Sequence, residues 1–431
     1  MSLNQFISGI LNINADLIEE INQIEQSDGS IVVKVKLSVK TICCPYCKGK
    51  VKIHDYTTKK LTHSVLANRN CIICFKRRRY RCDSCNITFS ESNPFSFPKE
   101  QITYETKINI LKDLKKPGET YTIVAHRYNV SVQTVLRIFD KHVNIERKTM
   151  PEVLSLDEHY FPNSDFDSIY CTLLMDFRTG ELIDVLPDRK KIHVTKYFSD
   201  IKYTTTDQFT KRSELDNVKY ISIDLYDNFR DIFRNLIPNA IICADSFHVL
   251  KHLTEDFDRV RKACYRSTEN EVLKNLLIKF RFVFNHNQFL DNEGKYNRAL
   301  GRYVNYRQIM DILFENFPEL KVAYNLKELY IMYNSIEDIS VAAEKFDAIK
   351  QAFEDSGIEQ YDEFITILKN WKQEIINSFT RIDGRRVNNS YIESKNRQIE
   401  HLMNNANGFV NFQRTRNRIL YCLNKSDTYL F

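Results

Sequence analysis

Residues 153–187 read VLSLDEHYFPNSDFDSIYCTLLMDFRTGELIDVLP, and this stretch decides the fold class of the middle of the chain. It contains three apolar runs, at 153–161, 168–177 and 181–187, each with the length and composition of a β-strand. Thr179-Gly180 between the last two runs predicts a tight hairpin turn. The stretch therefore predicts three consecutive antiparallel strands.

The chain then alternates between helix and strand. A helical piece near 193–201 is followed by the strand-like run VKYISIDL (218–225), a helix from about Tyr226 to Leu236, and the buried strand AIICAD (240–245). Three antiparallel strands followed by alternating helix and strand is the element order of an RNase H-like domain.

Two aspartates interrupt the apolar strands of this predicted domain. Asp157 lies within the first strand, and Asp224 ends the fourth strand directly after Ile-Ser-Ile. A carboxylate in a buried strand costs free energy unless it is paired or bound to a metal. These two strands are neighbours in the predicted fold, so both side chains could share one divalent ion. The alternative for each aspartate is a helix cap or an ordinary ion pair.

Asp245 and His248 follow the fifth predicted strand in the sequence ADSFH. The aspartate could cap the next helix, and the histidine three residues later would lie on the same helix face. The pair could supply further metal ligands or support for them. A plain cap with a packed histidine fits the pattern equally well.

Residues 249–380 have mostly helical spacing and contain no nucleotide-binding loop or repeat, so we expect a helical insertion with Trp371 in its core. The stretch NNSYIESKNRQIEHLMNNANGF (388–409) after it predicts another helix. Ile392, Ile399 and Met403 form its apolar stripe, and Glu393 lies on the flank of that stripe. Glu393 could pair with Arg397 one turn on, or it could be a third metal ligand, with Glu400 as its nearest competitor.

Two CxxC pairs near the start, Cys44/Cys47 and Cys82/Cys85, predict a zinc ribbon that holds one structural Zn²⁺. Cys71 and Cys74 have the same spacing but lie in a strand-like run, where residues three apart face opposite sides. We therefore expect that pair in the core, and Cys43 as a bystander.

A basic run lies between the two CxxC pairs (the zinc knuckles), in the sequence KRRRYR (76–81). On a strand it would present cations to DNA phosphates. The alternative is a solvated edge strand that resists aggregation. Beside a predicted zinc ribbon we favour DNA contact by Lys76, Arg77, Arg78, Arg79 and Arg81.

Helical spacing from Tyr104 and the segment TIVAHRYNVSVQTVLRIFDKHV (122–143) predict a helix-turn-helix. A tight turn at 128–130 would separate two helices, with Ser131 as the N-cap of the second. In such a motif the second helix enters the major groove, so Gln133, Thr134 and Arg137 would face bases or phosphates. A generic three-helix packing unit is the alternative.

The net charge of +6 is unevenly distributed, because basic residues exceed acidic ones in 1–150 and 376–431 whereas acidic residues prevail between them. Basic ends favour binding of a polyanion. The C-terminal Arg414, Arg416 and Arg418 would touch a DNA backbone or form a solvated helix face. The absence of a long apolar run or a basic leader predicts a cytoplasmic protein without a membrane segment, in which the 11 cysteines are reduced or metal-bound.

In this order the motifs resemble the transposases of the bacterial ISL3 insertion-sequence family. The resemblance rests on CPYC…CDSC, the helix-turn-helix, LSLDEHYF, ISIDLYDNF, PNAIICADSFHVLKHL and NNSYIESKNRQIEHLMNNANGFVNFQRTRNRIL. It implies a DDE catalytic triad on Asp157, Asp224 and Glu393, with Asp245 and His248 as the accompanying D-x-x-H element. Family members often have Gly-Arg-Val-Glu-Gly around the glutamate where this chain has Ser-Tyr-Ile-Glu-Ser. This departure keeps the carboxylate in place and affects only the expected shape of the local backbone.

The resemblance implies an α+β multidomain chain with an RNase H-like α/β catalytic core. We predict an N-terminal segment (1–39), the zinc ribbon (40–98), the helix-turn-helix (100–148), the first part of the core (150–248), the helical insertion (249–380), and the last core helix with a basic tail (381–431). Two Mg²⁺ or Mn²⁺ ions would serve cleavage and joining of double-stranded DNA at terminal inverted repeats, by a homodimer or larger assembly. The alternatives are a catalytically inactive zinc-ribbon/helix-turn-helix regulator and a purely hydrolytic nuclease.

Overall fold

The computed structural model describes residues 11, 13–40, 42–66, 69–161, 168–204, 212–285, 290, 293–406 and 411–430. These residues belong to two compact units. The terminal unit combines Met1–Glu146 with Arg397–Phe431, and the central unit combines Arg147–Pro162 with Phe166–Asn396. Among the described helices, none is both long enough and apolar enough to cross a membrane.

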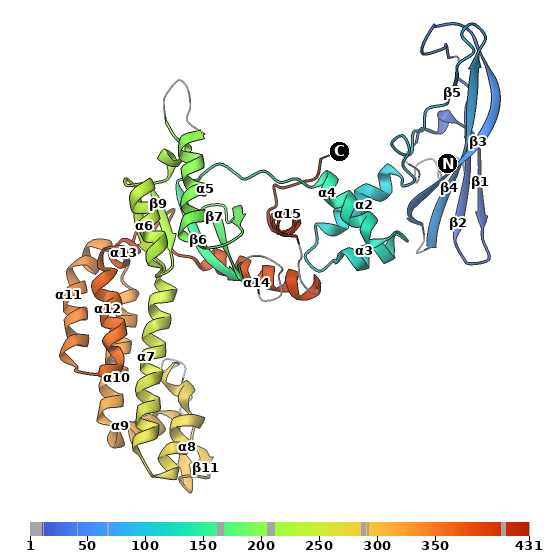
Figure 1. Cartoon of the computed structure of the whole chain (residues 1–431). Coiled ribbons are helices and arrows are strands. Elements are labelled where there is room, and N and C mark those ends of the chain that lie inside the picture. The colour runs from blue at the N-terminus through green and yellow to red at the C-terminus, as the bar shows by residue number, and fades with distance from the viewer. Residues whose placement is uncertain are drawn as a thin grey trace. The chain divides into compact units, whose positions relative to one another are not determined.

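A five-stranded sheet forms the first part of the terminal unit (Figure 1). Its order is β1-β2-β4-β3 with β5 on β4, and β2 runs parallel to β4 whereas the other pairs are antiparallel. Strands from the predicted N-terminal segment therefore share one sheet with those that carry the cysteines. The strands are β1 (Ile18–Glu25), β2 (Ile31–Leu37), β3 (Val51–Leu66), β4 (Arg69–Cys82) and β5 (Thr88–Ser90), preceded by a short 3-10 helix, η1 (Ala15–Leu17). Cys71 is buried in the core of this sheet, as predicted, whereas the prediction is wrong for Cys74, which is half-buried and lies outside that core.

Three helices follow the sheet: α2 (Tyr104–Leu114), α3 (Tyr121–Arg127) and α4 (Val132–His142). The predicted turn at 128–130 is present, and Asn129 adopts a left-handed backbone with a φ of 50°. Ser131 is the N-cap of α4, because its Oγ accepts a hydrogen bond from the Thr134 backbone N–H at 3.2 Å. Val135 and Ile138 are buried, as expected for the helix that packs on α3.

The C-terminal helix α15 (Phe412–Leu423) packs on these three helices within the terminal unit. Tyr421 Oη donates to Leu111 O at 2.9 Å, and Asn417 Nδ2 donates to Val143 O at 3.0 Å. The prediction of a DNA-facing or solvated arginine series is wrong for Arg416 and Arg418, because both are buried and donate to backbone carbonyls. Arg414 forms an ion pair with Asp140 instead.

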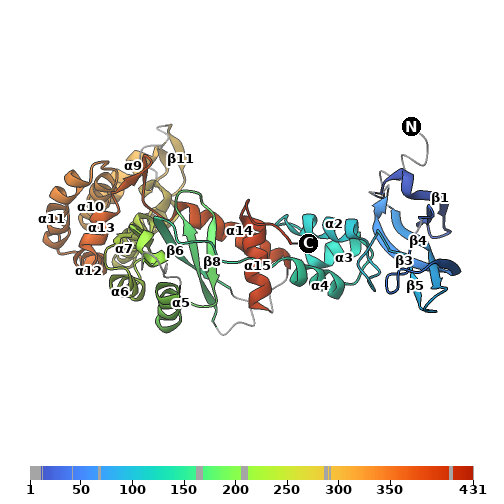
Figure 2. The same cartoon turned by 90° about the horizontal axis from the view of Figure 1, so that it is seen from above.

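A second five-stranded sheet, of order β10-β9-β6-β7-β8, organises the central unit (Figure 2). Strands β6, β7 and β8 are antiparallel neighbours, as predicted, whereas β9 and β10 run parallel to β6. Gly180 closes the predicted hairpin with a φ of 69°. Helices α5 and α6 cover one face, where Leu154, Leu156 and Phe198 share a core. The elements are β6 (Val153–Tyr160), β7 (Tyr170–Asp176), β8 (Leu182–Leu186), α5 (Lys191–Thr204), η2 (Glu214–Asn217), β9 (Tyr220–Ile223), α6 (Asp227–Leu236) and β10 (Ile241–Ala244).

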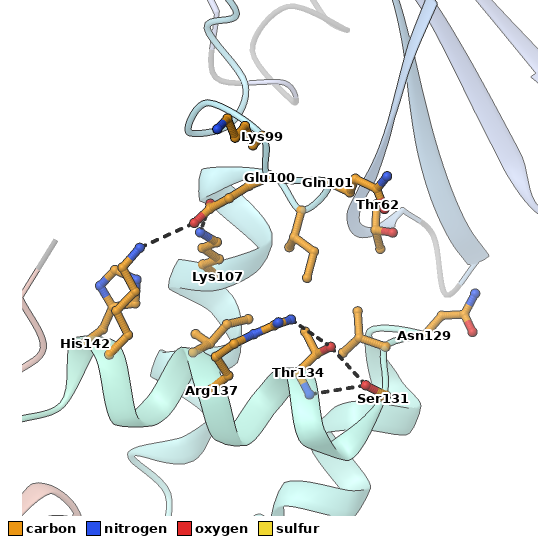
Figure 3. A pocket seen from close by; sticks show the side chains of 14 residues that line it. Thr62, Lys99, Glu100, Gln101, Lys107, Asn129, Ser131, Thr134, Arg137 and His142 are labelled. Carbon is orange, nitrogen blue, oxygen red and sulfur yellow. Dashed lines mark hydrogen bonds and ion pairs between the residues drawn. The ribbon is translucent and has the colours of Figure 1, made fainter.

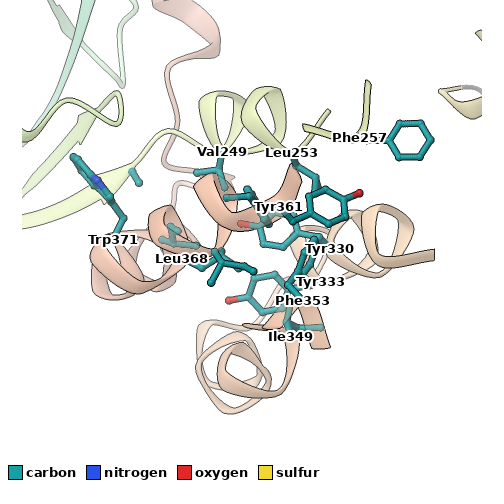
Figure 4. Close-up of a cluster of buried hydrophobic side chains, with 14 of the residues drawn as sticks. Val249, Leu253, Phe257, Tyr330, Tyr333, Ile349, Phe353, Tyr361, Leu368 and Trp371 are labelled. Carbon is teal, nitrogen blue, oxygen red and sulfur yellow. The ribbon is translucent and has the colours of Figure 1, made fainter. Parts of the chain in front are cut away.

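The segment 249–380 is mostly helical, as predicted, and its first helix is the long α7 (Ser246–Ser267), which follows directly after β10 (Figure 1). Its buried residues belong to the same hydrophobic core as those of the sheet. Figure 4 shows Val249 and Leu253 of α7 in the part of this core that the helices form. Trp371 is buried there, as predicted, with Arg230 stacked on its ring. The other elements are α8 (Glu271–Lys279), η3 (Arg281–Phe284), β11 (Lys295–Asn297), β12 (Arg302–Val304), α9 (Tyr306–Asn316), α10 (Pro318–Asn334), α11 (Ile339–Asp355), η5 (Glu359–Tyr361), α12 (Asp362–Asn370), α13 (Lys372–Asn377), β13 (Arg381–Ile382), β14 (Arg385–Arg386) and α14 (Ser390–Ala406).

Candidate active site

Strand register places three aspartates on one face of the central sheet. Ser155 pairs with Ser222, and Ser222 pairs with Cys243, across the parallel strands. Because alternate residues of a strand share a face, Asp157, Asp224 and Asp245 each follow two residues after one of these three aligned positions. The neighbouring positions, such as Leu156 and Ile223, lie in the core on the opposite face. The aspartates are therefore brought together by strand pairing alone.

Asp157, Asp224 and His248 form a compact group of potential metal ligands, whose ligand atoms all lie within 4.8 Å of one another. His248 Nε2 lies 3.2 Å from Asp224 Oδ1 and 3.9 Å from Asp245 Oδ2. Asp157 is 4% exposed and Asp245 is 1% exposed. Two carboxylates and an imidazole in this arrangement are a donor set compatible with a divalent cation.

The electrostatics of the group favour a bound cation. Burial raises the pKa of Asp157, and burial together with the nearby Asp157 charge raises the pKa of Asp224 well above its ordinary value. Burial also lowers the pKa of His248, which favours the neutral imidazole that ligates metals. Buried carboxylates of this kind are stabilised in their charged form by a nearby positive ion.

Helix α14 covers this face and contacts the aspartates through two asparagines. Asn389, at its N-terminal end, donates from Nδ2 to Leu156 O at 2.7 Å and to Asp224 Oδ1 at 3.2 Å. Its backbone N–H donates to Asp245 Oδ1 at 3.1 Å. Two turns on, Asn396 Nδ2 donates to Asp157 Oδ2 at 2.5 Å. Each aspartate of the face therefore receives a hydrogen bond from α14 or its cap.

Two oxygens beside these contacts are buried and unbonded among the described residues: Asn389 Oδ1 and Asp245 Oδ2. The amide orientation of Asn389 is fixed, because a flipped side chain would set its oxygen against Leu156 O. Buried oxygens without donors are costly, and a cation or its bound water would satisfy them. This observation supports the fit of the site to a divalent ion.

Glu393 lies between the two asparagines on α14. Residues 389, 393 and 396 are four and three positions apart, so they share one helix face. Glu393 is half-buried and its Oε1 is inaccessible to solvent, whereas the competitor Glu400 is exposed. Glu393 is not one of the three residues in the compact group. Ile392, Ile399 and Met403 are buried, which confirms the predicted apolar stripe of the helix.

Sequence reasoning missed Asn389 and Asn396, because an amide side chain is not itself a mark of catalysis. The sequence signal was their spacing in NNSYIESKN. Asn389 lies four residues before Glu393 and Asn396 three residues after it, which places all three on one helix face. That pattern becomes informative only once the face is known to lie over the aspartates.

Four cysteines of the terminal unit form a second group, in which Cys44, Cys47, Cys82 and Cys85 place all Sγ atoms within 4.8 Å. Lys48 and Asn86, just after the knuckles, have φ values of 60° and 58°. A Cβ at Gly49 would approach Ser84 Oγ to 2.6 Å, so glycine there lets the knuckles meet. Four thiolates at this spacing are compatible with one tetrahedral Zn²⁺, and Cys43 lies outside the group, as predicted.

The basic run on β4 divides into surface and buried residues. Lys76 and Arg81 are exposed, and Arg77 and Arg79 are half-buried. Arg78 is 0% exposed and forms ion pairs with Glu19 and Glu91 at 2.6 and 2.8 Å. Its predicted contact with DNA is therefore wrong, because the Arg78 side chain is buried and its guanidinium is neutralised by two carboxylates.

The three predicted contacts on α4 have different surroundings. Gln133 and Arg137 are exposed, and Thr134 is half-buried beside Ser131, with 2.9 Å between the two hydroxyl oxygens. Arg137 Nη2 lies 3.5 Å from Thr134 Oγ1.

The fold and these two groups define a mixed α+β protein with a four-thiolate group compatible with Zn²⁺ and a largely buried acidic group compatible with a divalent cation. A family model described as Transposase, that of the ISL3 family, matches residues 154–419. This match spans more than half of the chain, so the protein belongs to the ISL3 transposase family. No curated protein matches the chain.

Proposed function

We propose that this transposase binds terminal inverted repeats and catalyses metal-dependent cleavage and strand transfer of DNA. The observation that carries the proposal is the compact group of Asp157, Asp224 and His248 on the sheet face beneath α14, within the family match. Asp157, Asp224 and Glu393 would form the catalytic triad, and Asp245 and His248 would support it.

An RNase H-like core is part of this proposal. The order β10-β9-β6-β7-β8, with β6 in the middle, antiparallel to β7 and parallel to β9, supports it. So does the position of one aspartate within the central strand and another directly after its parallel neighbour. The insertion of helices between β10 and α14 is compatible with a last core helix that returns to the sheet with Glu393.

Asp157, Asp224 and Glu393 would hold two Mg²⁺ or Mn²⁺ ions, which when bound stabilise the attacking and leaving oxygens of phosphoryl transfer. The residues of this chain have separate tasks around them. Asn396 and Asn389 orient Asp157 and Asp224, and the His248 imidazole near Asp224 Oδ1 limits the rotation of that carboxylate. Glu393, on the same helix face as the two asparagines, would complete the set from above the sheet.

DNA recognition would rest on the terminal unit. We propose a zinc ribbon (40–98) with one structural Zn²⁺ and a helix-turn-helix (100–148) in which α4 is the recognition helix. The exposed or half-buried basic residues of β4 and the α4 residues Gln133, Thr134 and Arg137 would contact double-stranded DNA. A dimer or larger assembly is expected, since two transposon ends must be joined in one reaction.

Joining of labelled DNA ends to a plasmid tests the proposal. Inverted repeats that flank the gene supply the ends, and Asp224→Ala is the catalytic variant. We expect the parent protein to cut and join the ends with Mg²⁺ or Mn²⁺, and the variant to bind them without cutting. Binding without cutting by both proteins would instead indicate a regulator, and cutting without joining would indicate a hydrolytic nuclease.

A further inference from the structure

A polar groove of about 560 Å³ runs along α4 in the terminal unit (Figure 3). One wall is a stripe of α4 that includes Ser131, Thr134, Arg137 and Lys141. The opposite wall is the segment 99–102, which connects the sheet to α2 and pairs with β3 at Thr62. The groove therefore lies beside the face of α4 on which two of the predicted DNA contacts are found.

Cations outnumber anions in the groove. Four basic residues line it, Lys99, Lys107, Arg137 and Lys141, against a single carboxylate, Glu100. Glu100 already forms an ion pair with the buried Lys107, and its second contact is with Lys141 at 3.4 Å. Among the described residues, Lys99 and Arg137 have no acidic partner. The lining thus carries an excess of positive charge that a bound anion would neutralise.

Hydrogen-bond donors stand beside these cations. The hydroxyls of Ser131 and Thr134 occupy the first turn of α4, at the positive end of the helix. Arg137 extends along the groove toward Thr134 (Figure 3). A guanidinium, an ammonium and two hydroxyls along one wall match the oxygens of a phosphodiester better than they match an apolar or cationic ligand.

Both rims of the groove are held in an uncommon backbone conformation. Lys99 has a φ of 65° and Asn129 has a φ of 50°, and both residues line the groove. A left-handed backbone at a lysine is costly, and such residues tend to occur where function fixes the geometry. Lys99 is exposed, so its ammonium group is accessible at the edge of the groove.

Gln133 stands apart from these residues. It is exposed in the first turn of α4 but does not line the groove. The first turn of a recognition helix is the part that reaches base edges, and glutamine can bind adenine through two hydrogen bonds. The position of Gln133 outside the groove therefore distinguishes base contact by Gln133 from phosphate contact by Arg137, whereas the sequence pattern grouped the two residues.

We infer that the groove between α4 and residues 99–102 binds one DNA backbone segment, with Arg137, Lys141 and Lys99 on its phosphates, and that Gln133 reads bases beside it. The inference rests on the proposed function, because it assumes that the terminal unit binds DNA. It deepens that proposal by naming which residues set affinity and which sets sequence preference.

The experiment uses the full chain and two duplexes: one selected from a randomised pool by the parent protein, and a scrambled version of it. Fluorescence anisotropy gives the affinity for each from about 50 to about 200 mM NaCl. The variants are Arg137→Ala, Arg137→Ala with Lys141→Ala, and Gln133→Ala. Lys345→Ala, an exposed lysine of α11 in the central unit, is the matched control.

We expect Arg137→Ala to reduce the slope of log K against log[NaCl] by about 1, equally on both duplexes, and the double variant to reduce it by about 2. Gln133→Ala should keep the slope and lower the preference for the selected duplex by about tenfold. A normal slope in the Arg137 variants, or a loss of preference there, overturns the groove assignment while DNA binding stands. A parent protein that binds neither duplex overturns the proposed function as well.

Discussion

Asn396 Nδ2 donates a hydrogen bond of 2.5 Å to Asp157 Oδ2, across 239 residues of sequence. The oxygen of the same amide, Asn396 Oδ1, lies 3.1 Å from His159 Nδ1, so the amide is held at both of its polar atoms. A carboxylate fixed in this way presents its remaining lone pairs in one direction. The helix α14 therefore aligns the acidic group as well as covering it.

Removal of the Asn396 amide should weaken metal binding. We expect Asn396→Ala to lose about 10–100-fold in Mn²⁺ affinity, since residues that orient metal ligands have effects of this size. Asn396→Asp should lose at least as much, because it replaces the donor with an acceptor. Titration of the full chain with Mn²⁺, followed by electron paramagnetic resonance, measures this. Asn404→Ala, an exposed asparagine of the same helix, is the control, and equal affinities in all variants would contradict the role of Asn396.

Asn389→Ala should reduce the stability of the central unit. The side chain is fully buried and supports Leu156 O and Asp224, so its loss leaves acceptors unsatisfied at a cost of about 2–4 kcal/mol. Urea unfolding followed by the fluorescence of Trp371, the single tryptophan, reports on this unit. Asn388→Ala removes only a local bond to the Ser390 N–H and should cost less than about 1 kcal/mol. Equal costs for both variants would refute a special role for Asn389.

The metal-free central unit should lose stability as the pH rises. Burial holds the pKa of Asp224 well above its ordinary 3.8, so the folded protein binds this proton more tightly than the unfolded chain. The stabilisation is complete below pH about 4 and is lost as the pH rises through the folded-state pKa. In EDTA, Asp224→Asn should therefore melt at a higher temperature than the parent at pH 8, with a smaller difference at pH 5. Asp227→Asn, on the exposed side of α6, should show no such pattern.

Loss of one knuckle cysteine should abolish zinc binding and leave the acidic site intact. We expect about one Zn²⁺ per chain in the parent and none in Cys82→Ser, because a tetrahedral site needs all four thiolates. Cys43→Ser, an exposed neighbour outside the group, should retain its zinc. Elemental analysis measures the content, and an unchanged Mn²⁺ titration shows that the central unit is folded. Full zinc content in Cys82→Ser would disprove the assignment of this ligand.

Two arginines of α15 should differ in their contribution to the terminal unit. Arg418 is buried and donates to Lys116 O and Glu119 O, so Arg418→Ala should cost about 2–3 kcal/mol. Arg414 pairs with Asp140 near the surface, and Arg414→Ala should cost less than about 1 kcal/mol. Zinc release during urea unfolding follows this unit separately from Trp371. A larger effect at Arg414 than at Arg418 would contradict the structure.

The predictions from the sequence were most accurate for elements whose periodic apolar pattern agrees with the side of the element that is buried. The strands that carry Asp157 and Asp224, the helix with Ile392 and Ile399, and the N-cap at Ser131 follow from local rules of spacing and capping. The proximity of Asp157 and Asp224 then followed from the order of the strands. These features need no knowledge of distant partners.

The errors share a physical cause. Arg78 and Arg418 look like surface cations, but both are buried and paired in the tertiary structure. Arg78 pairs with Glu19 and Glu91, and Arg418 donates to two carbonyls between α2 and α3. A long basic side chain can be hydrogen-bonded inside a protein when enough acceptors converge on it. Only the tertiary structure reveals that convergence, so composition alone overestimates the DNA-binding surface.

The packing of α15 on α2 has a consequence for synthesis. The contact between Tyr421 and Leu111 spans 310 residues, and a ribosome adds about 5–20 residues each second. Helices α2–α4 are therefore synthesised roughly 15–60 seconds before α15, the helix that completes their core. During that interval the whole central unit is translated. A chain released early by a premature stop lacks α15, so the surfaces of α2–α4 that α15 buries stay exposed to water.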